Sequence, residues 1–188
     1  MILIGFGHRA RQGKNTAAQA VLEAQPLDCD VRMYAFADAL KKEVRVASAR
    51  YKGQWNLIET WKEAGLIPEW VHYEEPKPRT LLQWWGTEYR RKQDPLYWVK
   101  RLDKKLLEHN PDVALITDIR FLNEVEFIRQ RGGVVIECVR VGAPDFEVEE
   151  HQSERELDGF KWDYTITAET AEECRRKAVD VYKAIYRG

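Results

Sequence analysis

Short apolar runs alternate with amphipathic stretches along most of this 188-residue chain. The apolar runs have the length of strands and occupy residues 2–6, 31–36, 113–117, 134–141 and 164–167. The amphipathic stretches predict helices over residues 14–24, 39–51, 81–92, 96–109, 121–131 and 153–157, and from 170 onwards. Strands that alternate with helices are typical of an α/β protein with a mostly parallel sheet. The run Val113–Thr117 is apolar throughout, as expected of a parallel strand buried on both faces.

Polar residues and prolines mark where several helices should begin. Asp38 and Thr80 each precede an apolar helical pattern and are predicted N-caps. Asp94 followed by Pro95 predicts another helix start, because proline suits the first helical position. The stretch 52–79 is the least regular part of the chain, with a short predicted helix and a proline-containing loop.

Composition narrows the class of protein. The length suits one domain, and 30 basic against 31 acidic residues give a net charge of −1, which favours neither a nucleic-acid coat nor a membrane-surface binder. No apolar stretch approaches the roughly 20 residues of a membrane-spanning helix, and the N-terminal run lacks the order of a secretory signal. Three widely spaced cysteines suit a reducing compartment. We therefore expect a cytoplasmic globular protein.

The clearest chemical signal follows the first predicted strand. Residues 7–16 read GHRARQGKNT and lie between a predicted strand and a predicted helix, the context of a phosphate-binding loop. Backbone N–H groups and the helix N-terminus would attract an anion there, and Lys14 would add a point charge. The spacing departs from the usual pattern, since five residues separate Gly7 from Gly13 and Asn15 follows Lys14. The alternative is a basic surface loop that merely enters a helix.

Two further strand ends carry polar side chains. Ligands in open α/β sheets bind beyond the carboxyl ends of the strands, where the sequence has Asp38 with Lys41 and Asp118 with Arg120. Asp118 is a candidate for holding Mg²⁺ or its water shell. Each aspartate could instead cap a helix.

The predicted helix 81–92 has a polar face. Gln83, Thr87, Arg90 and Arg91 share it at α-helical spacing, and could read a base and hold a phosphate, although a solvated face explains the spacing equally well. Trp98, like Trp84, could stack on a ligand or anchor the core. The histidines and cysteines show no zinc-binding spacing, and no GxSxG motif is present.

Several ordered segments together resemble the bacteriophage-type deoxynucleoside monophosphate kinases, a branch of the P-loop kinases. These segments read IGFGHRARQGKNTAA, FADALKKEV, LLQWWGTEYRR with DPLYWV, TDIRFLNEVEFIRQRGG and HQSERELDG. The resemblance implies one P-loop kinase domain over residues 1–188, built as a three-layer sandwich. Within it, 38–100 would be a mostly helical monophosphate-binding region and 141–152 a lid-like loop.

The resemblance also implies roles for individual residues. ATP would be held by Gly13, Lys14, Asn15, Thr16 and Arg140. The reacting centre would comprise Lys14, Arg11, Asp118 and Arg120, with Thr16 and Asp118 on Mg²⁺. The acceptor nucleotide would meet Arg9, Asp38, Lys41, Gln83, Arg90, Trp98 and Glu154.

The expected reaction moves the γ-phosphoryl group of ATP to a deoxynucleoside 5′-monophosphate with Mg²⁺, and the expected partners are these small nucleotides. The accepted bases are open, as is a homodimer. One alternative is a P-loop kinase that acts on modified bases in DNA, which the near-neutral charge disfavours. Another is a nucleotide-binding protein without turnover.

Overall fold

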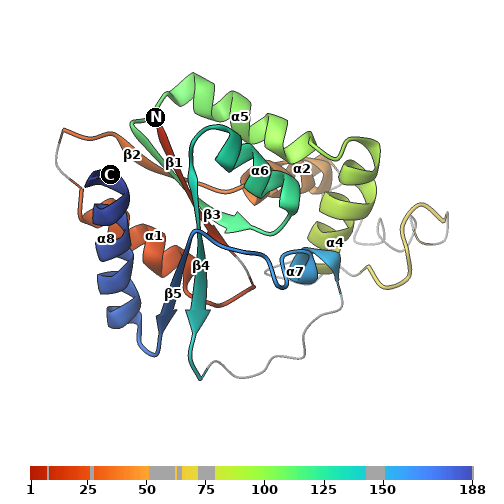
Figure 1. Ribbon diagram of the computed structural model, residues 1–188. Helices are drawn as coiled ribbons and strands as arrows, with labels where there is room; N and C mark the ends of the chain where they lie inside the picture. The colour runs from red at the N-terminus through yellow and green to blue at the C-terminus, as the bar shows by residue number, and fades with distance from the viewer. Residues whose placement is uncertain are drawn as a thin grey trace. The chain divides into compact units, whose positions relative to one another are not determined.

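The computed structural model describes residues 1–7, 9–25, 28–50, 62, 65–71, 79–142 and 151–187 (Figure 1). These residues divide into two compact units, Met1–Phe36 with Arg101–Gly188, and Ala37–Lys100. Most of the predicted lid-like loop 141–152, all but Arg79 of the predicted loop 73–79, and nearly all of the predicted helix 55–65 lie outside the described residues. The expectation of a single P-loop kinase domain stays a prediction.

The first unit is built on a five-stranded parallel sheet. In spatial order its strands are β2 (Val31–Tyr34), β3 (Val113–Ile119), β1 (Ile2–Gly7), β4 (Val134–Arg140) and β5 (Tyr164–Ala168). Every neighbouring pair is parallel, and the register aligns Ile4 of β1 with Leu115 of β3 and Val134 of β4. The α/β class with a parallel sheet, predicted from the alternation of patterns, is confirmed.

Helices cover both faces of this sheet. Ile4 and Phe6 of β1 pack into one core with α1 (Lys14–Glu23) and α8 (Ala171–Arg187), which lie side by side in Figure 1. The alternate position Gly5 faces the other way, towards Ile128 of α6 (Leu122–Gln130). Successive positions of β1 therefore face opposite sides of the sheet. The apolar run of β3 is fully buried, as predicted.

The second unit is helical. It contains α2 (Ala37–Arg50), α4 (Arg79–Trp84) and the π-helix η1 (Trp85–Arg91), and α5 (Tyr97–His109) begins within it. Its small core joins Val44, Leu81, Ile67 and Val71. Among the described residues, no helix is long and apolar enough to cross a membrane.

Several predicted boundaries were wrong. Asp38 and Thr80 lie inside the first turns of α2 and α4 rather than before them, so neither is the N-cap. Pro95 precedes α5 by two residues, because the Asp94 side chain first closes a turn by accepting the N–H of Leu96 at 3.1 Å. The cap predictions were wrong because aspartate and threonine are also favoured in the first turn of a helix and in local turns.

Candidate active site

The last three residues of the loop after β1 include two whose backbone has the left-handed conformation. Arg11 has φ 61° and Gly13 has φ 92°, and α1 begins at Lys14 directly after them. Such turns bring successive backbone N–H groups towards one concave side, next to the positive end of α1. The predicted order of strand, loop and helix is confirmed, in the arrangement from which a phosphate-binding loop would be built.

Lys14 is a buried cation at the start of α1. The residue is 8% exposed, and its ammonium group donates to the backbone carbonyl of Arg9. Burial and, second to it, the positive charge of Arg120 together lower the pKa of Lys14 from 10.5 to about 8, against the raising effect of nearby acidic groups that include Glu154. Lys14 therefore stands in a site where a bound anion would stabilise its charged form.

Arg120 extends from the chain just beyond β3, and two glutamates hold it. Its backbone N–H donates to the buried carboxylate of Glu124 at 2.8 Å. Its guanidinium pairs with Glu154 and donates to the carbonyl of Ser153 at 3.3 Å. Backbone and side chain are thus both anchored, which gives the guanidinium a defined direction at the end of the sheet.

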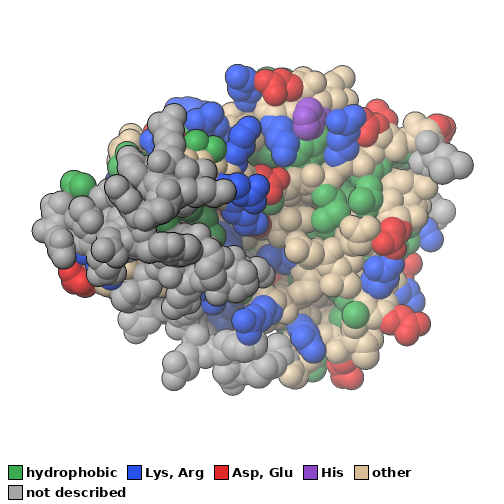
Figure 2. All heavy atoms as spheres, turned by 180° about the vertical axis from the view of Figure 1, so that it is seen from behind, with side chains coloured by type: hydrophobic (Ala, Val, Ile, Leu, Met, Phe, Trp, Pro, Cys, Tyr) green, Lys and Arg blue, Asp and Glu red, His purple; other side chains and the backbone are tan. Residues whose placement is uncertain are grey.

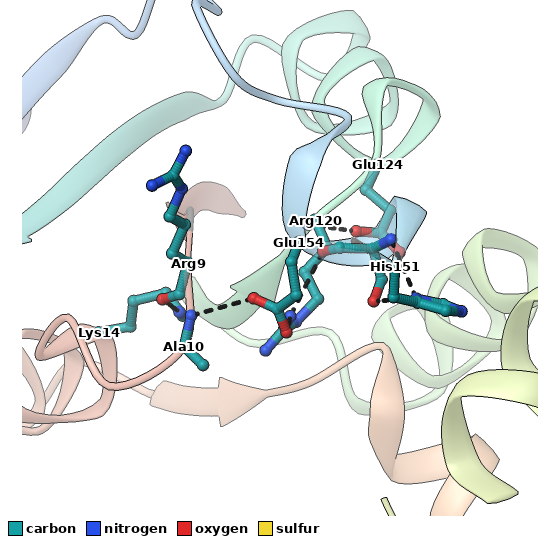
Figure 3. Close-up of polar contacts among 8 residues, drawn as sticks. Arg9, Ala10, Lys14, Arg120, Glu124, His151 and Glu154 are labelled. Carbon is teal, nitrogen blue, oxygen red and sulfur yellow. Dashed lines mark hydrogen bonds and ion pairs between the residues drawn. The ribbon is translucent and has the colours of Figure 1, made fainter. Parts of the chain in front are cut away.

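Glu154 links Arg120 to the loop after β1 (Figure 3). It lies on α7 (Gln152–Arg155), is 7% exposed, and its second carboxylate oxygen accepts the N–H of Ala10 at 3.3 Å. The ring of His151 accepts the N–H of Ser153 at 3.2 Å and so caps α7. An internal carboxylate is held here by a loop N–H and a guanidinium, with Lys14 close enough to feel its charge. These are the groups that bind phosphates in proteins.

Asp118 is the second-last residue of β3, and α6 begins four positions later, at Leu122. One carboxylate oxygen accepts the N–H of Phe36 at 2.8 Å, so Asp118 ties β3 to the chain after β2. It does not cap α6, which begins at Leu122. The helix-cap alternative for Asp118 is therefore wrong.

The two predicted metal ligands carry oxygen atoms, the ligand type that Mg²⁺ prefers. Thr16, two positions into α1, contributes a hydroxyl, and Asp118 contributes a carboxylate. The described residues contain no group of three or more His, Cys, Asp or Glu side chains that could hold a metal ion. Mg²⁺ is commonly held by one or two side chains together with phosphate oxygens and water, and its binding by Thr16 and Asp118 stays a prediction.

The other predicted residues of the first unit lie on or near the loop. Arg11 and Asn15 are exposed, and Arg9 pairs with Asp158 at 2.8 Å. Arg140, at the end of β4, is joined to the loop because its backbone N–H donates to the side chain of Gln12 at 2.7 Å. The structure thus gathers the loop with Lys14, Arg120 and Glu154, whereas ligand contacts for these residues stay predictions.

The residues between positions 38 and 98 that were predicted to bind the acceptor nucleotide all belong to the second unit. Asp38 and Lys41 are exposed on α2, and Gln83 is partly buried on α4. Trp98 is 2% exposed and donates to the carbonyl of Gly86 at 2.9 Å, which matches the core-anchoring alternative rather than ligand stacking.

Arg90 lies in an aromatic and acidic setting. Its Nε donates to Glu43 of α2 at 3.0 Å, and its guanidinium carbon lies 4.9 Å from the ring centre of Tyr97 and 5.0 Å from that of Tyr89. The polar face predicted for Gln83, Thr87, Arg90 and Arg91 assumed α-helical spacing. That assumption was wrong, because residues 85–91 form a π-helix. Tyr89 is 37% exposed.

Three residues of these sites were not predicted from the sequence: Glu43, Glu124 and His151. Glu124 had a usable signal, since a glutamate at the third position of a helix often reaches back to the N-terminal N–H groups. Glu43 and His151 had none, because their partners lie on other elements or depend on an unusual cap.

Comparison with known proteins agrees with the resemblance seen in the sequence. No protein-family model matches the chain. A protein of Escherichia phage T5 named "Deoxynucleoside-5'-monophosphate kinase" is 37% identical over 82 residues, which are 43% of this chain and 31% of that protein. A protein of Acanthamoeba polyphaga mimivirus named "Putative deoxynucleotide monophosphate kinase" is 28% identical over 173 residues, 86% of this chain and 84% of that protein. The predicted resemblance to deoxynucleoside monophosphate kinases is thus confirmed by two similar proteins, over less than half of the chain in one case and most of it in the other.

Proposed function

We propose that this protein transfers the γ-phosphoryl group of ATP to a deoxynucleoside 5′-monophosphate, forming the diphosphate and ADP with Mg²⁺. The observation that carries the proposal is the buried carboxylate of Glu154, bound by the loop N–H of Ala10 and by Arg120 beside Lys14. A site that holds one anion with these groups can hold a phosphate with them. The names of the two similar viral proteins support the choice of acceptor.

The reaction needs positioning and positive charge more than it needs a base. An oxygen of the acceptor phosphate attacks the γ-phosphorus, and the bond from that phosphorus to the β–γ bridging oxygen breaks, which releases ADP. The acceptor is already anionic at neutral pH, because the second pKa of a phosphate monoester is about 6. Charge spreads over the oxygens of the transferred group, where Lys14 and Arg120 would neutralise it.

Mg²⁺ would be held by the Thr16 hydroxyl and the Asp118 carboxylate, and would neutralise phosphate charge when bound. The chain's own part is to orient the phosphates. The backbone N–H groups of the loop would bind donor phosphate oxygens, and Glu124 would keep Arg120 directed at the reacting centre through its backbone.

The alternative of a kinase that acts on bases within DNA has less support. The chain carries 30 basic and 31 acidic residues, and on the face drawn in Figure 2 acidic side chains (red) lie beside described basic ones (blue). A protein that follows a nucleic-acid backbone needs a continuous positive surface.

The direct test is an ADP-release assay with ATP, Mg²⁺ and each of the common deoxynucleoside and ribonucleoside monophosphates. We expect release that depends on the acceptor, with a base preference visible in the same experiment. Lys14→Ala should fold, as judged by circular dichroism, and should lose this release. ATP binding without acceptor-dependent release would favour the non-catalytic alternative, and normal turnover by Lys14→Ala would remove the loop from the mechanism.

A further inference from the structure

One partly buried carboxylate organises the second unit, and no sequence pattern pointed to it. Among the described residues, Glu43 on α2 accepts hydrogen bonds from Arg90 Nε at 3.0 Å, from Trp85 Nε1 at 3.3 Å and from the hydroxyl of Tyr97. The side chains of Glu43 and Arg90 are 18% and 25% exposed. Three elements, α2, η1 and α5, thus converge on one acceptor.

The charge of Glu43 is stabilised by these contacts. Burial raises the pKa of the carboxyl group, but the hydrogen bonds from Tyr97 and Trp85 and the charge of Arg90 outweigh it, so the pKa lies below 4.5. Glu43 is therefore ionised at neutral pH and forms a charge-assisted bond to Arg90.

The π-helix explains how Trp85 and Arg90 reach the same carboxylate. Hydrogen bonds in a π-helix join residues five apart, so positions 85 and 90 come one above the other. In an α-helix the same two positions would point in different directions. The wide turn also stacks the guanidinium near the rings of Trp85, at 6.0 Å, and Tyr89.

This arrangement leaves the outer edge of the guanidinium available. Glu43 engages Nε alone, and within the described part of the chain neither terminal nitrogen of Arg90 makes a hydrogen bond. Two parallel N–H groups on a flat, restrained guanidinium match the oxygens of a phosphate.

We propose that Glu43 is a positioning residue that fixes Arg90 for the phosphate of the acceptor nucleotide. The proposal rests on the proposed function, in that the acceptor is a nucleoside monophosphate. Glu43 touches no substrate in this role. It limits the rotamers of Arg90, so less freedom is lost when the phosphate binds.

The test is calorimetric binding of the four common deoxynucleoside monophosphates, with steady-state KM and kcat measured alongside. Glu43→Gln should weaken monophosphate binding and raise its KM about tenfold, because a charged hydrogen bond to Arg90 is lost. The KM for ATP should stay within about twofold, the factor expected when no donor-site contact changes. Glu108→Gln is the matched control, since Glu108 forms an exposed pair with Lys104 at 3.8 Å, and it should change neither constant.

A double-mutant cycle separates positioning from a structural role. In an Arg90→Lys background, which keeps the charge but lacks the fork, Glu43→Gln should have little further effect on monophosphate binding. Tyr97→Phe removes one donor to Glu43 and should give a smaller loss of binding, so the proposal remains testable if Glu43→Gln does not fold.

The outcomes distinguish this proposal from the proposed function. The positioning role would be overturned, and the kinase left intact, if Glu43→Gln turned over substrate with unchanged monophosphate binding. An equal loss of binding from Glu43→Gln in the unchanged protein and in the Arg90→Lys background would have the same meaning. Binding that depends on Glu43 and Arg90 without any turnover would support the positioning role and overturn the kinase.

Discussion

At the scale of single residues, Lys14 shows how a site can be poised for an anion. Its ammonium group is buried, close to Arg120, and bonded to the carbonyl of Arg9. The charged form is therefore less favourable in the folded chain than in the unfolded chain, and the pKa falls to about 8. Phosphate oxygens would remove this cost, so part of the binding energy of the donor would come from Lys14.

This pKa predicts how activity depends on pH. Transfer requires protonated Lys14, so kcat/KM for ATP should fall as pH rises through about 8, the value in the free protein. Folding stability should change with pH in the opposite direction and rise. Because the folded pKa lies below the unfolded value of 10.5, the cost of the buried charge is present below about pH 8 and is relieved between about 8 and 10.5.

The measurement is a pH profile of kcat/KM from 6 to 10, with denaturant unfolding over the same range. A flat kcat/KM up to pH 10 would contradict the assignment of Lys14 as the titrating group.

At the scale of elements, the close approach of β1 to the segment before β5 restricts Gly7. A Cβ at position 7 would lie 2.2 Å from the ring of Trp162 and 3.2 Å from the backbone oxygen of Ile119. Even a methyl group would have to displace a packed ring or the neighbouring strand. The last residue of β1 is therefore glycine for packing, in addition to any role in the loop.

We expect Gly7→Ala to lower the free energy of unfolding by about 1–3 kcal/mol, the usual cost of overpacking. The check is urea unfolding at neutral pH. Trp162→Leu should restore part of the loss when combined with Gly7→Ala, because the smaller side chain leaves room for the methyl group. A double variant as unstable as the sum of the singles would point to the Ile119 backbone instead.

At the scale of the whole molecule, charge is nearly balanced, with a net value of −1. In the proposed function, a few placed cations such as Lys14 and Arg120 would recognise phosphate, without a broad positive surface. The protein should therefore bind free nucleotides and leave double-stranded DNA unbound.

A gel-shift experiment with duplex DNA at low salt measures this directly, with ATP and Mg²⁺ absent and present. We expect no shift at micromolar protein. A shift that disappears as salt rises would revive the kinase acting on bases in DNA, because phosphate contacts release counterions.

The sequence by itself determined the parallel α/β sheet and the loop after β1. Both depend on local patterns, namely continuous apolar runs, amphipathic periods and glycines beside a lysine, which each segment carries without reference to the others. The same local reasoning misplaced the caps at Asp38 and Thr80, because short polar side chains have several uses near a helix start.

Only the tertiary structure decided which charges meet. Glu154 reaches Ala10 across 144 positions of sequence and Arg120 across 34, and Glu43 reaches Arg90 across 47. The π-helix that turns Trp85 and Arg90 to one side also depends on packing, since the local pattern suits an α-helix equally well. Spacing along the chain describes one element at a time, whereas an electrostatic site forms where elements distant in sequence come together, and that depends on the packing of the whole fold.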